Sequence, residues 1–335
     1  MSVFTPVETN DVRQQGMTTL ETDPTSQSTA PALPGASSAP PGQAGDVPTE
    51  LQEIELDLLL EGIYRRYGYD FRDYARASLR RRILHSMSVA GIPHITDLLT
   101  RVLHDETAFD ALVRAISITT TDMFRDPSFF AALREHVIPI LKTYPFIKIW
   151  HAGCSTGAEV YSLAILLEEE GFYNRSQIYA TDINGHALLE AKAGIYPLDL
   201  LQKWAAGYTA AGGRKRLDGY YDAAYGFGKL HGSLRRNITF TYHNLVTDSV
   251  FGEMNLILCR NVLIYFNPGL QARVISLFAS SLCHQGFLCL GTKESLELSR
   301  QSERFIALTA QYSIYRKRAH HGSEPPLDLT LPPVR

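Results

Sequence analysis

The sharpest structural signal in the chain is FIKIWHAGCSTGAEVYSLA, residues 146–164. It begins with a β-rich run and continues, after a turn, into a helical run. Gly153 and Gly157 lie in the turn. In doubly wound folds such a turn brings a nucleotide-like ligand to backbone N–H groups at a helix N-terminus, and glycine permits the close approach.

The same alternation continues on the C-terminal side of this stretch. The β-rich runs are FIKIWHA (146–152), QIYATD (177–182), ITFTYHNL (238–245), MNLILCR (254–260) and GFLCLG (286–291), and helical runs separate several of them. This pattern predicts an α/β fold with a mainly parallel, Rossmann-like sheet and helices on both faces. The stretch 200–237, which contains Gly, Tyr and Arg, fits no such unit and is predicted to be an insertion.

The N-terminal side has a different pattern. From 49 to 143 apolar residues recur at spacings of three and four, as in IELDLLLEGIYRRY (54–67), so this part is predicted to be a helical domain. Gly91-Ile92-Pro93 breaks the chain, and Asp126-Pro127 is typical of a helix start. Residues 1–48 and 319–335 are poor in large apolar groups and are expected to be a disordered leader and a flexible tail. The sheet domain then spans 144–318.

Bulk composition excludes several classes of partner. The 335 residues are 45% apolar and 20% charged, with a formal net charge of −3, so nothing draws the whole chain to nucleic acid. The start of the chain does not resemble a signal peptide, and no run is long enough to span or insert into a membrane. The cysteines form no C-x-x-C pair, and the histidines lack metal-ligand spacing. We expect a cytoplasmic protein without a metal.

Three kinds of site fit the glycine turn. NAD would require G-x-G-x-x-G, whereas this turn has only Gly153 and Gly157. Gly153-x-Ser155-x-Gly157 matches a hydrolase nucleophile elbow, but in such hydrolases several strands precede the elbow. S-adenosylmethionine needs a carboxylate for its ammonium group, which Glu159 offers, and an acid for its ribose at the end of the next strand, which Asp182 offers. The alternative is a tight turn without a ligand, with Glu159 as a solvated acid at a helix start.

Four strings resemble the chemotaxis receptor methyltransferases of the CheR type. They are ISITTTDMFRD (116–126), AGCSTGAEVYSLA (152–164), YATDINGHALLEAKAGIYP (179–197) and LILCRNVLIYF (256–266), and they occur in the family's order. The resemblance covers roughly Ile54 to Arg318. It implies a small helical domain on a Rossmann-like methyltransferase sheet, with a small β-subdomain inserted in the unassigned stretch.

The resemblance also implies an activity. S-adenosylmethionine would be the methyl donor, and the acceptor would be a glutamate side chain on the helical cytoplasmic domain of a methyl-accepting chemoreceptor, which would become a methyl ester. Arg125 and Tyr265 would line the methyl-transfer site. The cofactor contacts would come from Thr119, Thr121, Arg125, Glu159, Asp182, Asn244, Leu245, Arg260 and Asn261.

The chain departs from the family at two places. The family often has Asn at the position of Thr119, and Gly-Glu-Glu-Pro where this chain has Gly157-Ala158-Glu159-Val160. Glu159, the acid that matters for the cofactor, is retained.

The proposed chemistry needs no general base. A glutamate side chain has an ordinary pKa near 4.3, so it is already an anionic nucleophile at neutral pH. Arg125 could orient this carboxylate, and Tyr265 could donate its hydroxyl or form a wall.

Two alternatives stay open: a degenerate module that binds S-adenosylmethionine and signals by protein contacts, and an enzyme that methylates a small carboxylate. The basic clusters Arg80-Arg81-Arg82 and Arg214-Lys215-Arg216 are either solvated faces or receptor contacts.

Overall fold

The structure of the protein is a computed structural model that describes residues 50–117, 121–296 and 299–319. The predicted leader, residues 1–48, and the tail from residue 320 lie outside these ranges. The predicted fold class is confirmed: a Rossmann-like sheet follows a helical N-terminal part and carries a small β-subdomain. The domain boundaries stay predictions. Within the described ranges, no helix is both long and apolar enough to cross a membrane.

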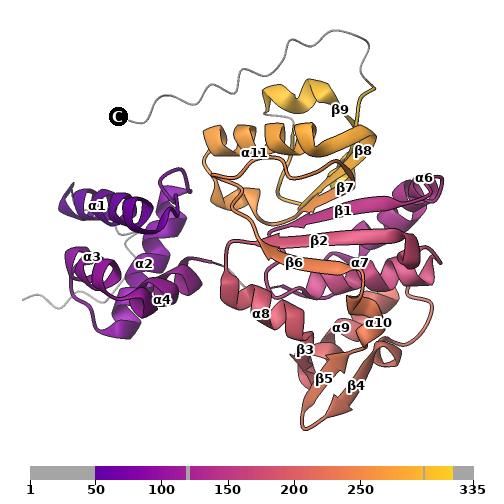
Figure 1. Ribbon diagram of the computed structural model, residues 1–335, viewed down its shortest axis with the longest axis horizontal. Helices are drawn as coiled ribbons and strands as arrows, with labels where there is room; N and C mark the ends of the chain where they lie inside the picture. The colour runs from indigo at the N-terminus through magenta and orange to yellow at the C-terminus, as the bar shows by residue number, and fades with distance from the viewer. Residues whose placement is uncertain (1–49, 118–120, 297–298, 320–335) are drawn as a thin grey trace, which may run out of the picture. The chain divides into compact units, whose positions relative to one another are not determined.

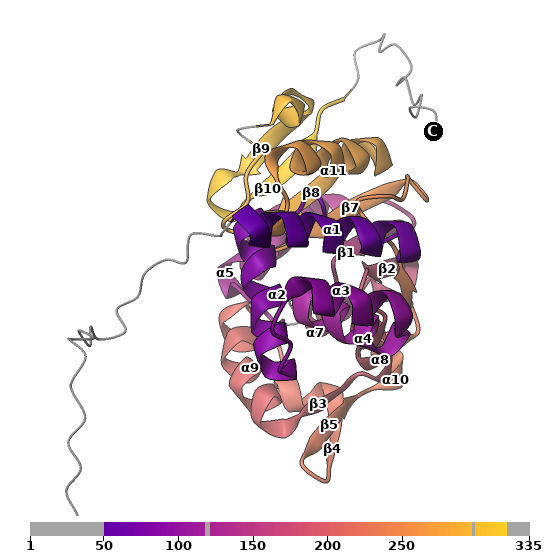
Figure 2. The same ribbon diagram turned by 90° about the vertical axis from the view of Figure 1, so that its left-hand side faces the viewer.

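The N-terminal part is built from helices around their own core. They are α1 (Glu50–Tyr67), α2 (Arg76–Ala90), α3 (Ile95–His104) and α4 (Glu106–Ile116). Figures 1 and 2 show α1 lying beside α3. Their buried face includes Leu59, Ile83 and Val102, which are excluded from solvent. Gly91 ends α2 with φ at 65°, a backbone conformation that disfavours side chains, so the predicted break there is confirmed.

A short helical connection leads from this part to the sheet. It comprises α5 (Pro127–Ala132), a π-helical turn (Leu133–Val137) and α6 (Ile138–Leu141). Pro127 occupies the first turn of α5, as predicted, and Asp126 precedes it. The carboxylate of Asp126 makes no capping hydrogen bond, however, because it pairs with Arg260 instead.

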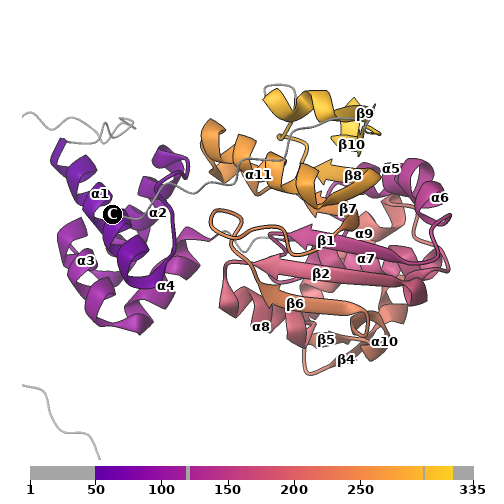
Figure 3. The same cartoon turned by 45° about the horizontal axis from the view of Figure 1, so that its top comes forward.

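A sheet of seven strands forms the centre of the C-terminal part, in the order β6-β2-β1-β7-β8-β10-β9 (Figures 1 and 3). The strands β6, β2, β1, β7 and β8 are mutually parallel, whereas β10 runs antiparallel to β8 and to β9. Their bounds are β1 (Ile147–Ala152), β2 (Ser176–Asp182), β6 (Ile238–Tyr242), β7 (Met254–Cys259), β8 (Leu282–Leu290), β9 (Phe305–Thr309) and β10 (Ile314–Lys317). The five parallel strands correspond to the five predicted β-rich runs, whereas β9 and β10 are not predicted.

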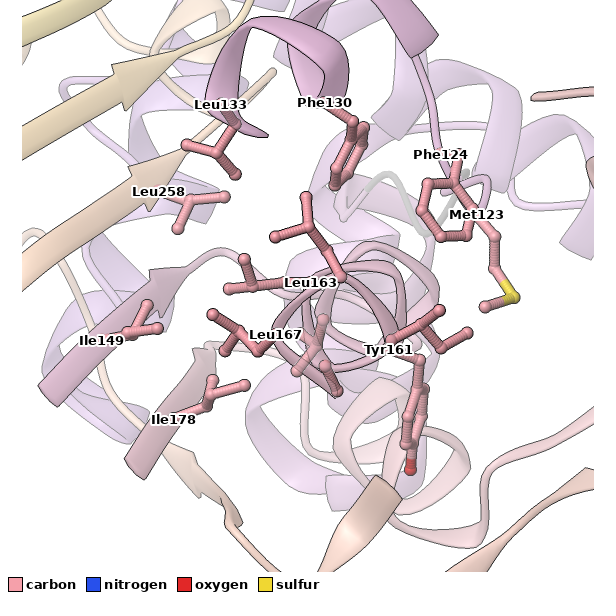
Figure 4. Close-up of a cluster of buried hydrophobic side chains, with 14 of the residues drawn as sticks. Met123, Phe124, Phe130, Leu133, Ile149, Tyr161, Leu163, Leu167, Ile178 and Leu258 are labelled. Atoms are coloured by element: carbon pink, nitrogen blue, oxygen red, sulfur yellow. The ribbon is translucent and has the colours of Figure 1, made fainter. Parts of the chain in front are cut away.

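Helices cover both faces of this sheet, as predicted. They include α7 (Ala158–Glu169), α8 (Gly185–Ala193) and α11 (Pro268–Ser281). In β1, Ile149 belongs to the core that contains α7, whereas Trp150 belongs to the core that contains α11, because successive side chains point to opposite faces. Figure 4 shows Leu163 and Leu167 of α7 facing strand residues of the sheet, Ile149 among them.

The unassigned stretch forms a small antiparallel sheet in the order β3-β5-β4, with two helices (Figure 1). The elements are β3 (Ile195–Pro197), α9 (Leu198–Ala210), β4 (Tyr221–Ala224), β5 (Phe227–Leu230) and α10 (Gly232–Arg235). Tyr208 on α9 and Tyr220 both donate hydrogen bonds to Glu169, which joins the insertion to the end of α7.

The two glycines of the turn after β1 are required by packing against the protein itself. Gly153 has φ at 72°, and a Cβ atom there would lie 2.4 Å from Val262 Cγ2. Gly157 has φ at 84°, and its Cβ would lie 2.9 Å from Ala191 Cβ on α8. The sequence pattern predicts that these glycines permit the approach of a ligand. The contacts of the chain with itself are a sufficient reason for both.

The loop after β7 is organised by one buried carboxylate. Glu294, only 6% exposed, accepts hydrogen bonds from the backbone N–H groups of Asn261 (2.9 Å), Val262 (2.8 Å), Ile264 (3.3 Å) and Gly291 (2.6 Å). Burial raises the pKa of Glu294, and the backbone donors oppose this rise. The carboxylate therefore satisfies N–H groups that the loop itself cannot pair.

Replacing Glu294 by alanine should lower the free energy of unfolding by about 3 kcal/mol or more, because several buried N–H groups lose their acceptor. Glu294→Gln keeps one acceptor oxygen and should lose about half as much. Chemical denaturation followed by circular dichroism measures both values. Glu253→Ala, at an exposed acid before β7, is the control and should change stability by less than about 0.5 kcal/mol. A Glu294→Ala variant as stable as the control would contradict this account of the loop.

Candidate active site

A cavity lies at the carboxyl ends of β1, β2 and β7, where β1 pairs with β2 on one side and with β7 on the other. This is the switch point at which ligands bind in doubly wound sheets. Every predicted site residue that the structure describes lines this cavity: Thr121, Arg125, Glu159, Asp182, Asn244, Leu245, Arg260, Asn261 and Tyr265. Thr119 lies outside the described residues.

The helical N-terminal part supplies one wall of the cavity. Its lining residues are Phe71, Tyr74, Ala75, Ser78, Leu79, Arg82, Ile116 and Ser117. Two backbone hydrogen bonds attach this wall to the loop after β7, from Ala75 N to Tyr265 O (2.7 Å) and from Asn267 N to Asp73 O (2.9 Å). The wall is mainly apolar, which favours exclusion of water from whatever the cavity binds.

A buried ion-pair network lies beneath the glycine turn. Arg260 Nη1 donates to Glu159 Oε2 at 2.5 Å, and Arg260 Nη2 donates to Asp126 Oδ2 at 2.6 Å. His151 Nε2 lies 3.2 Å from the other oxygen of Glu159. Burial alone would raise the pKa of Glu159, but Arg260 and His151 more than offset it and hold this pKa below its ordinary value.

This network changes the role expected of Glu159. The sequence predicts that the Glu159 carboxylate is free to pair with an ammonium group. In the structure both carboxylate oxygens already accept hydrogen bonds from protein side chains. Glu159 can still attract a cation, because the network holds two carboxylates, Glu159 and Asp126, against one guanidinium, Arg260.

The backbone around Arg125 is held in an unusual conformation. Phe124 and Asp126, on either side of it, have φ at 52° and 54°, which costs residues other than glycine about 1–3 kcal/mol each. Phe124 N donates to Ser162 Oγ (2.8 Å), and Asp126 pairs with Arg260. The Arg125 guanidinium, in contrast, has no hydrogen-bond or ion-pair partner among the described residues. Arg125 is thus positioned by its neighbours and available to a ligand.

Asp182 ends β2 and is fastened to the glycine turn. Its Oδ2 accepts from Ser155 N (2.7 Å), and its Oδ1 accepts from Asn184 N (2.8 Å). Burial raises the pKa of Asp182, although these backbone donors oppose the rise. The carboxylate is therefore fixed in direction and retains acceptor capacity for hydroxyl groups.

Tyr265 is oriented by an arginine that the sequence analysis assigned only to a basic surface cluster. The Arg82 guanidinium carbon lies 4.8 Å from the centroid of the Tyr265 ring, and Arg82 also donates to the carbonyl oxygen of Ile116. Both Arg82 and Tyr265 line the cavity. Arg82 lies in the second turn of α2, directly after its exposed neighbour Arg81.

His151 and Asp126 belong to the site but are not among the residues predicted from the sequence. The position of His151 could have been predicted from strand alternation, because residues two apart in a strand share a face. His151 therefore lies on the same face as Ile149, which packs toward α7, the helix that carries Glu159. Asp126 had been interpreted as a helix cap. Its partner Arg260 is far away in the sequence, so only the folded chain could reveal the pair.

The cavity has the groups that S-adenosylmethionine requires. Asp182 suits ribose hydroxyl groups, Leu245 is an apolar wall, and Arg125 suits a carboxylate. Five buried polar atoms of lining residues have no hydrogen-bond partner among the described residues: His151 Nδ1, Ser155 Oγ, His243 Nδ1, Asn244 Nδ2 and Arg260 Nε. Because buried polar groups are nearly always paired, these atoms indicate that a polar ligand completes the site.

Comparison with known proteins identifies the family. Residues 54–117 match the family described as CheR methyltransferase, all-alpha domain, and residues 119–313 match CheR methyltransferase, SAM binding domain. A Pseudomonas putida protein provisionally named methyltransferase Cher3 is 52% identical over 265 residues, which cover 79% of this chain and 97% of that protein.

Two further relatives are named chemotaxis protein methyltransferase. The protein of Vibrio anguillarum is 33% identical over 238 residues, 68% of this chain and 84% of its own length. The protein of Listeria monocytogenes is 28% identical over 250 residues, 73% of this chain and 92% of its own length. Together with the cavity and the fold, these matches show that the chain belongs to the CheR family of chemotaxis methyltransferases, which bind S-adenosylmethionine.

Proposed function

We propose that the protein methylates glutamate side chains on the helical cytoplasmic domain of a methyl-accepting chemoreceptor and so forms glutamate methyl esters. The observation that carries this proposal is a pair of guanidinium groups, Arg82 and Arg125, which line the cavity without a carboxylate partner among the described residues. The proposal locates the enzyme in the cytoplasm, where such a receptor domain lies.

The charges of the cavity support a carboxylate acceptor. Arg260 pairs with both Glu159 and Asp126, so its positive charge is already compensated within the protein. Arg82 and Arg125 are the remaining cations of the lining, and two anionic groups would have to be bound: the methionine carboxylate of the cofactor and the acceptor carboxylate. Guanidinium groups bind carboxylates through parallel hydrogen bonds, which fix direction as well as position.

The reaction requires positioning more than proton transfer. When bound, S-adenosylmethionine supplies a methyl group on a positively charged sulfur, which a carboxylate oxygen can take up without losing a proton. Arg125 would orient the acceptor carboxylate, and the Tyr265 ring, held under Arg82, would form the wall beside it. Holding two reactants in line is worth about 7–11 kcal/mol of barrier lowering.

The helical wall supports a protein acceptor over a small carboxylate. An α-helical segment that carries the glutamate would approach the α2 side of the cavity, which Ser78, Leu79 and Arg82 line. Two relatives of this chain are named chemotaxis protein methyltransferase. We propose that the remaining cofactor contacts come from Thr119, Thr121, Glu159, Asp182, Asn244, Leu245, Arg260 and Asn261.

Purified protein incubated with labelled S-adenosylmethionine and receptor-containing membranes should transfer base-labile label to a receptor-sized band. Arg125→Ala should lower kcat/KM by about 100-fold, because it removes a charge-assisted hydrogen bond to a carboxylate. Tyr265→Ala should lower it by about tenfold, because it removes the ring that forms the wall beside the acceptor. The matched control is Arg101→Ala, which removes an exposed arginine of α3 and should leave the rate unchanged.

Absence of transfer to any fraction, despite binding of S-adenosylmethionine, would reject the receptor methyltransferase and favour a module that senses the cofactor through protein contacts. Label on a soluble small molecule instead of the receptor would favour the small-carboxylate enzyme.

Cofactor binding should weaken as the pH falls from neutrality. The weakening should begin at a higher pH than it would with an aspartate of ordinary pKa. The reason is that burial raises the pKa of Asp182, and the protonated form is a poorer acceptor for ribose hydroxyl groups. Isothermal titration of S-adenosylhomocysteine against pH measures this effect. Asp182→Asn should bind about tenfold more weakly at neutral pH and show a flatter pH dependence. An unchanged pH dependence in Asp182→Asn would assign the effect to another group.

A further inference from the structure

His151 is a buried polar residue of the cavity for which the proposed function has no use. It lies near the end of β1, is 3% exposed and lines the cavity. Its Nε2 contacts Glu159 Oε1 at 3.2 Å. Its other ring nitrogen, Nδ1, is buried and has no hydrogen-bond partner among the described residues.

The contact with Glu159 decides which nitrogen carries the proton. Glu159 is ionised, because Arg260 donates to it at 2.5 Å and its pKa lies below the ordinary value. An ionised carboxylate only accepts hydrogen bonds, so Nε2 of His151 must carry the hydrogen. In the neutral imidazole Nδ1 is then a hydrogen-bond acceptor, and leaving it buried without a donor costs about 1–3 kcal/mol.

The charge around His151 selects the kind of donor. Glu159 and Asp126 carry two negative charges, and Arg260 between them carries one positive charge, so the network has one negative charge in excess. The ribose hydroxyl groups of the cofactor have an acceptor in Asp182, at the end of the neighbouring strand. A cationic N–H donor would compensate the excess negative charge and would also donate a hydrogen bond to the lone pair of Nδ1.

We propose that Nδ1 of His151 accepts a hydrogen bond from the α-ammonium group of the methionine moiety of S-adenosylmethionine. Glu159 then also orients the imidazole, and His151 adds a direct contact with the ammonium group. The inference rests on the cofactor site of the proposed function. It does not depend on the identity of the methyl acceptor.

Two conservative variants separate a ligand contact from a structural role. Glutamine can present its amide near the position of Nε2 and so keep a donor to Glu159, but it lacks a group at Nδ1. Asparagine can present its amide near Nδ1 and loses the contact with Glu159. The probes are S-adenosylhomocysteine and its deaminated analogue, titrated calorimetrically into wild type, His151→Gln and His151→Asn.

Wild type should bind the deaminated analogue about tenfold more weakly than S-adenosylhomocysteine, since one charge-assisted hydrogen bond is lost. His151→Gln should lose about tenfold in affinity for S-adenosylhomocysteine and less than about twofold for the deaminated analogue. His151→Asn should retain more of the preference for the ammonium group than His151→Gln does.

The opposite order of the two variants, with His151→Gln equal to wild type and His151→Asn impaired, would overturn the proposal and make His151 a residue that only positions Glu159. Equal affinity of wild type for both ligands would also overturn it, and this arm needs no variant. Loss of receptor methylation with these affinities unchanged would count against the proposed acceptor and leave the inference about His151 intact.

Discussion

The guanidinium group of Arg260 bridges Glu159 on α7 and Asp126 before α5, at 2.5 and 2.6 Å. Its carbon also lies 4.0 Å from the centroid of the Phe129 ring. Three segments far apart in the sequence therefore meet at one buried cation. Removing one member of such a buried network costs about 3–5 kcal/mol, because the partners stay buried without compensation. The geometry of the site depends on this contact.

The bridge also determines which charges remain for ligands. Because Arg260 takes up Asp126, the neighbouring Arg125 keeps no acidic partner among the residues that the structure describes. The same ion pair holds Asp126 in its left-handed conformation, and the hydrogen bond from Phe124 N to Ser162 Oγ holds that of Phe124. Because Arg260 compensates Asp126, Arg125 can bind an anion from a ligand. Buried hydrogen bonds offset the strain in the backbone on either side of Arg125.

The parallel part of the sheet could be predicted because each strand and helix has a local pattern of apolar residues. The strands β9 and β10 were missed, since they are short antiparallel strands whose pairing with β8 is a long-range contact. The insertion was recognised only as a departure from the βα pattern; its three-stranded sheet required pairing between β3 and β5 across α9. The predicted site residues followed from a family resemblance, and their roles stay predictions.

Sequence alone determined the fold class, the strand-turn-helix at Gly153 and Gly157, and the set of residues that gather at the ends of β1, β2 and β7. The fold class and the turn follow from local periodicity and from the rule that parallel strands end at one edge, whereas the set of site residues follows from the family resemblance. The tertiary structure decided which groups are paired: Glu159 is engaged by Arg260 and His151, Asp126 is an ion-pair partner, and Arg82 faces Tyr265. Pairing depends on distances between segments remote in sequence, which no local pattern encodes.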